Sequence, residues 1–163
     1  EKLLLKNGLE CIDDFAFDSC VSLKEIEIPS SIKQIKNNAF QNCTSLEKVI
    51  MPTSLTKLDN GLFYKCIKLK DIDLSHIIEI GDSTFESCFA FTEVNISSSL
   101  IQIGSTSFKN CKSLKQLTIP SSTTKIGSSC FQDCSSLEKV IILSPITVIP
   151  DIQYYQQNIN VPF

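Results

Sequence analysis

The sequence predicts a solenoid, a stack of short coils that repeat one another along the chain. Phenylalanine recurs every 22 or 23 residues, at Phe17, Phe40, Phe63, Phe85, Phe108 and Phe131. A cysteine follows each phenylalanine by three residues, at Cys20, Cys43, Cys66, Cys88, Cys111 and Cys134. With position 1 of the repeat set at Ser30, positions 3, 6, 17, 20 and 22 are also apolar in all six copies, except at Thr123. Self-similarity at a fixed period is the signature of a repeat architecture.

The repeat predicts one strand and one compact turn per coil. A coil of about 23 residues cannot bury seven apolar side chains alone, but stacked coils bury them against their neighbours. Positions 20 and 22 alternate inward in a stretch rich in β-branched residues, so we expect a strand there and one parallel sheet across all six coils. Positions 8 to 14 predict a 3₁₀ or single α turn that directs Phe and Cys inward. Glycine at position 7, as in Gly81, Gly104 and Gly127, predicts a positive φ.

The recurring pattern L-x-x-I-x-I-P-x-S-L-x-x-I-G-x-x-x-F-x-x-C-x-S covers Leu9 to Leu143 and resembles the BspA-like class of leucine-rich repeats. The resemblance implies a right-handed horseshoe or superhelix, with a parallel β-sheet on the concave side and short 3₁₀ or helical turns on the convex side. It also implies a recognition role, often in surface proteins of bacteria and microbial eukaryotes.

The register divides the chain into three parts. Residues 1–8 are a partial N-terminal repeat, in which Leu3 and Leu5 occupy positions 20 and 22. Residues 9–143 hold six repeats of about 23 residues, and residues 144–163 are a degenerate repeat that we expect to form a C-terminal cap. An open coil exposes core and strand edge. Because no N-terminal cap is visible, we expect either further chain upstream or an oligomer contact through that end.

Composition excludes several classes of partner. The net charge is -3, and all fifteen basic residues are lysine. Arginine is the residue that usually forms bidentate hydrogen bonds to phosphates and bases, so we expect no nucleic-acid binding. No apolar run reaches the length of a membrane span, so we expect no membrane insertion. We also expect no cofactor and no dedicated metal site.

The first candidate site is the outward row of the predicted sheet, a candidate concave binding face that we call the strand face. It comprises positions 19 and 21, namely Glu25, Glu27, Lys48, Ile50, Asp71, Asp73, Glu93, Asn95, Gln116, Thr118, Lys139 and Ile141. Five acids against two lysines favour a basic partner. The group Asp71, Asp73, Glu93 and Asn95 could serve glycoside hydrolysis or bind Ca²⁺. A solvated sheet face is the simpler interpretation, because no walled pocket or aromatic sugar platform is evident.

The second candidate site is an edge patch of four apolar or aromatic residues at positions 12 and 15, namely Val21, Tyr64, Ile67 and Phe89. Together they could form an exposed interaction surface, although local packing is the default interpretation.

The cysteines of position 14 predict a ladder of buried free thiols rather than disulfides, because their Cβ vectors should run parallel into the core. Cys130 is expected to be buried as well. Cys11 lies at position 5, among polar residues of the other repeats, and is predicted to be the solvent-reachable thiol. His76 replaces a serine in a turn, and we expect no catalytic pair with Cys66.

The sequence therefore favours a non-enzymatic protein-binding module that recognises another protein or surface macromolecule. The resemblance points to recognition or adhesion at a cell surface. An intracellular scaffold or regulatory segment of a larger protein remains an alternative, because unpaired thiols fit a reducing compartment. A β-helix enzyme acting on polysaccharide is a remote third hypothesis, and it would depend on Asp71 and Glu93.

Overall fold

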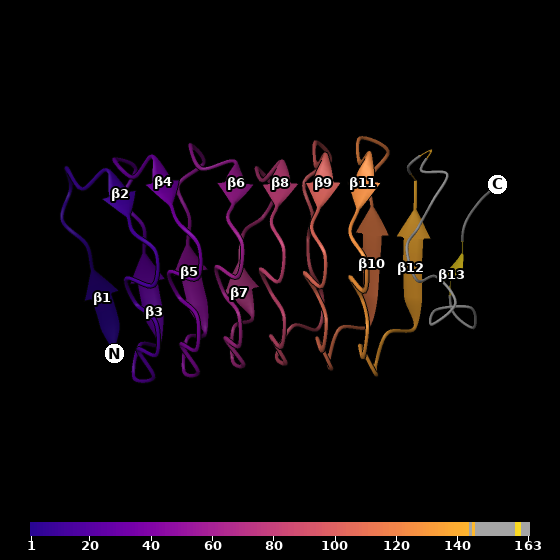
Figure 1. Cartoon of the computed structure of the whole chain (residues 1–163), viewed down its shortest axis with the longest axis horizontal. Helices are drawn as coiled ribbons and strands as arrows, with labels where there is room; N and C mark the ends of the chain where they lie inside the picture. The colour runs from indigo at the N-terminus through magenta and orange to yellow at the C-terminus, as the bar shows by residue number, and fades with distance from the viewer. Residues whose placement is uncertain (144, 146–158, 161–163) are drawn as a thin grey trace.

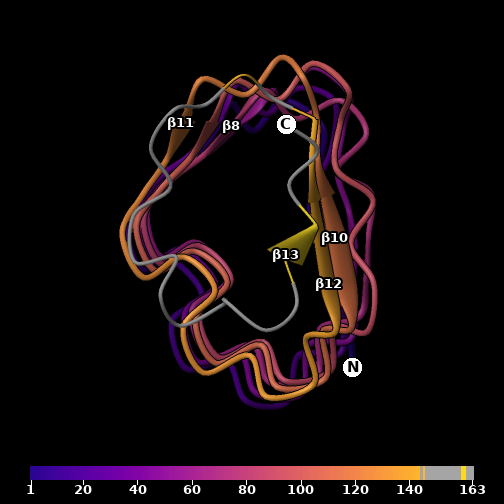
Figure 2. The same cartoon turned by 90° about the vertical axis from the view of Figure 1, so that its right-hand side faces the viewer.

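The computed structural model describes residues 1–143, 145 and 159–160. The coils lie side by side along one axis, in chain order from β1 to β12 (Figure 1). Viewed along that axis, successive coils superpose on one outline, with β10 and β12 on one side and β8 and β11 on another (Figure 2). Equivalent repeat positions therefore lie in rows along the stack, and the predicted β-solenoid is confirmed.

The predicted strand at positions 19 to 22 is present in most coils. Neighbouring strands pair in parallel with repeat positions aligned, so that Ile26 lies beside Val49 and Val49 beside Ile72. The strands in this row, which we call the long-strand row, are β1 (Lys2–Leu4), β3 (Glu25–Glu27), β5 (Lys48–Ile50), β7 (Asp71–Ile72), β10 (Gln116–Ile119), β12 (Lys139–Ile142) and β13 (Ile159–Asn160).

A second strand, of two residues, occupies positions 5 and 6 of each coil and forms another parallel row. The sequence analysis did not predict it. Its members are β2 (Cys11–Ile12), β4 (Gln34–Ile35), β6 (Lys57–Leu58), β8 (Glu79–Ile80), β9 (Gln102–Ile103) and β11 (Lys125–Ile126). They form two sheets, in the orders β2-β4 and β11-β9-β8-β6, so this row is interrupted between β4 and β6.

The long-strand row is not one continuous sheet, which corrects the expectation of a single sheet across six coils. It splits into the orders β1-β3-β5-β7 and β10-β12-β13. Between them the fourth coil makes two isolated bridges, from Ile96 to Leu74 and from Glu93 to Gln116. The two bridges still join equivalent repeat positions, so the fourth coil keeps the register of its neighbours although it forms no continuous strand in this row.

The segment at positions 8 to 14 forms hydrogen-bonded turns, and no helix occurs among the described residues. Residues at positions 9 and 13 have positive φ in every coil, for example Asn38 at 56° and Asn42 at 57°. With positive φ at these two positions, the N–H groups of Asn38, Phe40 and Asn42 donate to carbonyls of the next coil. These bonds between coils occur together with i→i+3 turn bonds, such as the one from the Gln41 N–H to the Asn38 carbonyl at 3.0 Å. The segment is therefore a series of turns rather than the expected helical turn.

Glycine at position 7 has a different cause from the positive φ that we expected. Among the glycines, only Gly8 and Gly61 have positive φ. A Cβ on Gly104 would lie 2.5 Å from the amide nitrogen of Asp82 and from the carbonyl carbon of Gly81. Position 7 therefore needs glycine in the later coils because the preceding coil approaches too closely for a side chain.

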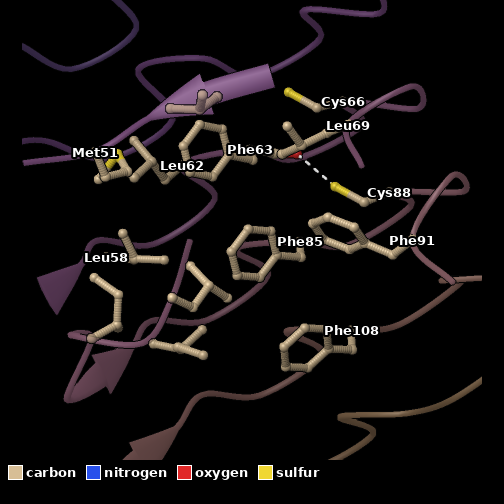
Figure 3. Packing of buried hydrophobic residues seen from close by; sticks show 14 of the residues in the cluster. Met51, Leu58, Leu62, Phe63, Cys66, Leu69, Phe85, Cys88, Phe91 and Phe108 are labelled. Atoms are coloured by element: carbon tan, nitrogen blue, oxygen red, sulfur yellow. Dashed lines mark hydrogen bonds between the residues drawn. The ribbon is translucent and has the colours of Figure 1, made fainter. Parts of the chain in front are cut away.

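The six repeat phenylalanines form one continuous stack through the core. Ring centroids of successive residues are 5.1 to 5.9 Å apart, from Phe17 to Phe131. Figure 3 shows Phe63, Phe85 and Phe108 in this stack. At position 17 of the fourth coil, Phe91 replaces the usual leucine and meets Phe85 edge-on at 5.3 Å. The predicted internal row of phenylalanines is confirmed.

The first coil is less well covered than the others. Leu9, at an inward position of the repeat, is 42% exposed. Phe17 and Cys20 are half-buried, whereas Phe40 and Cys43 in the second coil are fully buried. The predicted C-terminal cap (144–163) lies outside the described residues, apart from residue 145 and the two residues of β13, which pair with β12.

Candidate interaction surfaces

The strand face is directed away from the core, as its alternation predicted. In β3 and β5, Glu27 and Ile50 are exposed while Ile26 and Val49 are buried. Glu25, Lys48 and Ile141 are half-buried, and the other nine residues of the face are exposed. Parallel register aligns the face in rows, so side chains of neighbouring coils can contact the same partner.

Ion pairs neutralise part of the acidic charge on this face. The Nζ of Lys2 lies 3.1 Å from Glu25 and 3.9 Å from Glu27. Lys48 pairs with Asp71 at 2.9 Å. Within the described part of the chain, Asp73 and Glu93 have no ion-pair partner. The unneutralised charge is therefore concentrated where the sheet is interrupted.

Asp73 is held ionised by its own turn. The Ser75 backbone N–H donates to Asp73 Oδ1 at 2.9 Å, at the site of the missing residue. This hydrogen bond lowers the pKa of Asp73, and the nearby His76 acts in the same direction. Asp73 consequently presents a full negative charge at neutral pH.

Two open hollows lie on the strand face, on either side of Asp71 and Asp73. One, of about 540 Å³, is lined by Leu4, Glu27 and Ile50 among others. The other, of about 510 Å³, is lined by residues of the interrupted fourth coil and its neighbours, including Glu93, Asn95, Gln116, Thr118 and Ile141. The face thus offers shallow depressions for side chains of a partner rather than a flat surface.

Sequence reasoning missed two members of this face. Lys2 and Leu4 occupy positions 19 and 21 of the partial repeat, and Leu4 is 70% exposed. The signal was available, because Leu3 and Leu5 had already fixed the register of that repeat. Including Lys2 would have placed a lysine beside Glu25 in the same row of the face.

The acidic group shows no arrangement suited to metal binding or acid catalysis. No cluster of three or more metal-ligating side chains occurs in residues 1–143 or at the other described positions. Asp71 is exposed and ion-paired with Lys48, whereas a general acid in glycoside hydrolysis needs a desolvated setting.

The described residues also include no helix with the length and apolar character needed to cross a bilayer.

The edge patch does not form a single apolar surface. Val21 and Phe89 are exposed, while Tyr64 and Ile67 are half-buried. Val21 is separated from Ile67 by a whole coil, which has Thr44 at the equivalent position. Tyr64, Ile67 and Phe89 lie on consecutive coils, and lysines approach two of the rings, Lys65 at Tyr64 and Lys112 at Phe89, each 5.1 Å from the centroid.

The cysteine ladder is made of free thiols, as predicted, and Cys11 is the exposed one. The ladder also has a function in packing that the sequence did not predict. Each cysteine from the second coil onward donates its S–H to the carbonyl of the phenylalanine in the preceding coil. Figure 3 shows the bond from Cys88 to Phe63, 3.3 Å long. Burial raises the pKa of Cys134 to about 12 and that of Cys111 well above its ordinary value.

His76 lies at a position where two other coils bond to the coil before them. At this position, Ser31 donates to the carbonyl of Leu9 and Ser122 to that of Leu100, each at 2.7 Å. Both ring nitrogens of His76 are buried, and neither has a hydrogen-bond partner in the part of the chain that the structure describes. The substitution therefore costs stability without forming a pair with Cys66, whose thiol donates to the carbonyl of Phe40.

Solved structures similar to this chain are bacterial leucine-rich repeat proteins. A leucine-rich repeat protein from Bacteroides ovatus matches with a TM-score of 0.82 and 25% identity, over 100% of this chain and 42% of its own. A leucine rich cell surface protein from Faecalibacterium prausnitzii matches with a TM-score of 0.71 and 25% identity, over 88% of this chain and 48% of its own. The T. pallidum leucine-rich repeat protein matches with a TM-score of 0.55 and 28% identity, over 86% of this chain and 57% of its own.

The chain thus spans about half the length of these proteins. A comparison with curated proteins found no match. The family model of the BspA type leucine rich repeat region matches six copies, over residues 1–88 and 78–161. Together with the six stacked phenylalanines, this match shows that the chain belongs to the BspA-type leucine-rich repeat family.

Proposed function

We propose that this repeat array is a non-enzymatic binding module whose strand face docks a basic segment of another protein. The observation that carries the proposal is the pair of exposed acids, Asp73 and Glu93, which have no ion-pair partner in residues 1–143 and lie where the long-strand row is interrupted. Glu93 also lines one of the two hollows on this face. A lysine or arginine of a partner can neutralise these acids while neighbouring side chains enter the hollow.

The energetics favour recognition spread over several coils. Exposed ion pairs are individually weak, so a binding face needs several of them in register with apolar contacts. The aligned rows of the strand face provide that repetition, with Leu4 and Ile50 in the other hollow as apolar contacts. Electrostatic complementarity of this kind mainly raises the association rate and selects the sign of the partner.

Charge reversal tests the proposal with a probe of defined chemistry. The probe is a fluorescent peptide of alternating lysine and leucine, titrated with the protein while anisotropy is recorded at low salt. The double variant Asp73→Lys/Glu93→Lys should weaken binding at least about tenfold, because it replaces the unpaired acids with like charge. Raising the ionic strength should weaken wild-type binding as well.

A matched control changes net charge equally at a distance from the strand face. Glu10 and Asp133 are both exposed, and the variant Glu10→Lys/Asp133→Lys should bind the probe nearly as well as wild type. Equal loss in the two double variants would mean that overall charge, not the strand face, attracts the peptide, and the proposal would be wrong.

We further propose that the module acts at a cell surface in recognition or adhesion. Support comes from the family and from the similarity to a leucine rich cell surface protein of Faecalibacterium prausnitzii. An intracellular scaffold is the alternative, which the free thiols favour. Antibody labelling of intact against permeabilised cells distinguishes the two, because only a surface protein is labelled in intact cells.

A further inference from the structure

A second surface of the solenoid carries charge of the opposite sign to the strand face. The segments 64–70, 86–92 and 109–115 cover positions 12 to 18 of the third, fourth and fifth coils. They contain six lysines and one acid, Glu86, although the whole chain has a net charge of -3. We call this surface the lysine edge, and its lysines are Lys65, Lys68, Lys70, Lys109, Lys112 and Lys115.

Backbone hydrogen bonds place the three segments of the lysine edge side by side. The Lys65 N–H donates to the carbonyl of Glu86 at 2.8 Å, and the Ser87 N–H donates to that of Lys109 at 2.8 Å. All six lysines are exposed except Lys109, which is half-buried. In the described part of the chain only Lys70 has an ion-pair partner, Glu47 at 3.2 Å. Five positive charges are therefore available to a ligand.

An apolar centre lies among these lysines. Phe89, on the middle coil, is 36% exposed, and Ile67 and Tyr64 on the adjoining coil are half-buried. The Nζ of Lys112 lies 5.1 Å from the Phe89 centroid, so the charge borders the ring directly. Phe91 fills the buried position 17 of this coil and packs against Phe85. Phe89 is thus not needed to fill the core.

We propose that the lysine edge binds an acidic peptide segment that carries an aromatic or aliphatic side chain. The lysines match the carboxylates of such a segment, and the Phe89 ring provides a contact for its apolar side chain. A polyanion without apolar groups would use only the lysines, and the chain contains no arginine, the residue that binds phosphate and sulfate in bidentate fashion. The edge and the strand face would then select partners of opposite charge.

Anisotropy titrations with two labelled peptides test this proposal on the whole chain. One peptide consists of glutamates around a single phenylalanine, and the other has serine in place of the phenylalanine. The first should bind with at least about fivefold higher affinity than the second. Lys68→Glu/Lys112→Glu should weaken the first peptide at least about tenfold, and Phe89→Ser should abolish the difference between the two peptides.

The control Lys6→Glu/Lys125→Glu changes net charge equally at exposed lysines outside the edge, and it should alter affinity by less than about twofold. Far-ultraviolet circular dichroism of each variant checks that the fold is retained. The proposal is overturned if the control weakens binding as much as Lys68→Glu/Lys112→Glu. It is also overturned if heparin fragments or phosphatidylserine vesicles bind as tightly as the first peptide, independently of Phe89. Self-association that Lys68→Glu/Lys112→Glu abolishes, without any peptide binding, would equally overturn it.

Discussion

At the scale of single residues, a side chain of the repeat can pack in its own coil and also bond to the coil before it. The thiol of Cys111 donates to the carbonyl of Phe85 at 3.2 Å, so the cysteine column fills space and also adds a second donor to a carbonyl that already accepts from the Cys88 N–H at 3.1 Å. A valine would fill similar space but leave that carbonyl without this donor. This explains why a small apolar side chain with a weak donor recurs at position 14.

The buried thiols predict a specific alkaline loss of stability. Burial raises the pKa of Cys134 from 9.0 to about 12, so the folded protein keeps the proton that the unfolded chain releases above pH 9. The contribution of this thiol is therefore fully present below about pH 9 and is lost as pH rises toward 12. Urea unfolding under reducing conditions at pH 7, 9 and 10.5 measures this.

The comparison variant for the alkaline experiment is Cys134→Ala. Lysines titrate in both proteins, so only the difference between their changes in free energy of unfolding reports the titration of the Cys134 thiol. The wild type should lose more free energy of unfolding than Cys134→Ala between pH 9 and 10.5. Parallel pH profiles would contradict the assignment of a raised pKa to Cys134.

His76 predicts a stabilising substitution. His76→Ser removes two ring nitrogens that are buried without partners among the described residues, and it restores the hydroxyl that Ser31 and Ser122 use to bond the preceding coil. The free energy of unfolding should rise by about 1 kcal/mol, since unsatisfied buried nitrogens are replaced by a hydroxyl that can form a hydrogen bond. Ser122→Ala, which removes such a bond at the same position, should change it in the opposite direction. A loss of stability in His76→Ser would show that the ring contributes packing greater than this cost.

At the scale of elements, the close approach of coils at position 7 predicts a strong effect of a single methyl group. Gly104→Ala places a Cβ 2.5 Å from backbone atoms of residues 81 and 82, which cannot move without shifting the coil. Overpacking of this kind should lower the free energy of unfolding by about 2 kcal/mol. Chemical denaturation gives the value.

The matched control for Gly104→Ala is Lys36→Ala, because both variants place an alanine at position 7 of a coil. Its Cβ is already present, and only an exposed ion pair with Asp13 is lost. It should leave the stability close to that of wild type. If both variants were equally stable, the close contact at Gly104 would have to be relieved by a small movement of the coil.

The rows of buried residues were predictable from the sequence, because seven columns of apolar side chains fix the register without reference to local propensity. The second strand was not, because two residues at positions 5 and 6 are too few to show alternation. Positive φ at positions 9 and 13 was also hidden. Its occupants include Phe15, Lys65 and Thr106, and the cause is hydrogen bonding between coils rather than residue preference.

The candidate surfaces were predictable only in part. Strand alternation identified the twelve residues of the strand face, and parallel pairing put them in rows. The ion pairs that leave Asp73 and Glu93 without partners depend on side-chain placement across coils, which periodicity does not give. The lysine edge was missed for another reason. Its six lysines come from two segments, 64–70 and 109–115, which lie far apart in the sequence on either side of the lysine-free segment 86–92, so only the stacking of the coils brings them to one surface.

At the scale of the whole molecule, stability should vary along the stack, because each coil gains its stability from contacts with its neighbours. Phe63 and Phe85 in the middle coils are fully buried, while Phe17 in the first coil is half-buried. Their backbone N–H groups make equivalent hydrogen bonds to the next coil, of 2.8 to 2.9 Å. Differences in protection between them therefore report the stability of the coil and not the geometry of one bond.

Hydrogen exchange followed by mass spectrometry should show this gradient. Peptides that cover Phe17 should exchange at least about tenfold faster than peptides that cover Phe63 or Phe85, because the first coil can open without disturbing the rest. His76→Ser should slow exchange in the middle coils and leave the first coil unchanged. Equal protection from Phe17 to Phe85, lost together as denaturant is added, would mean that the array opens as a single unit. In that case, local stabilities summed coil by coil would not describe this solenoid.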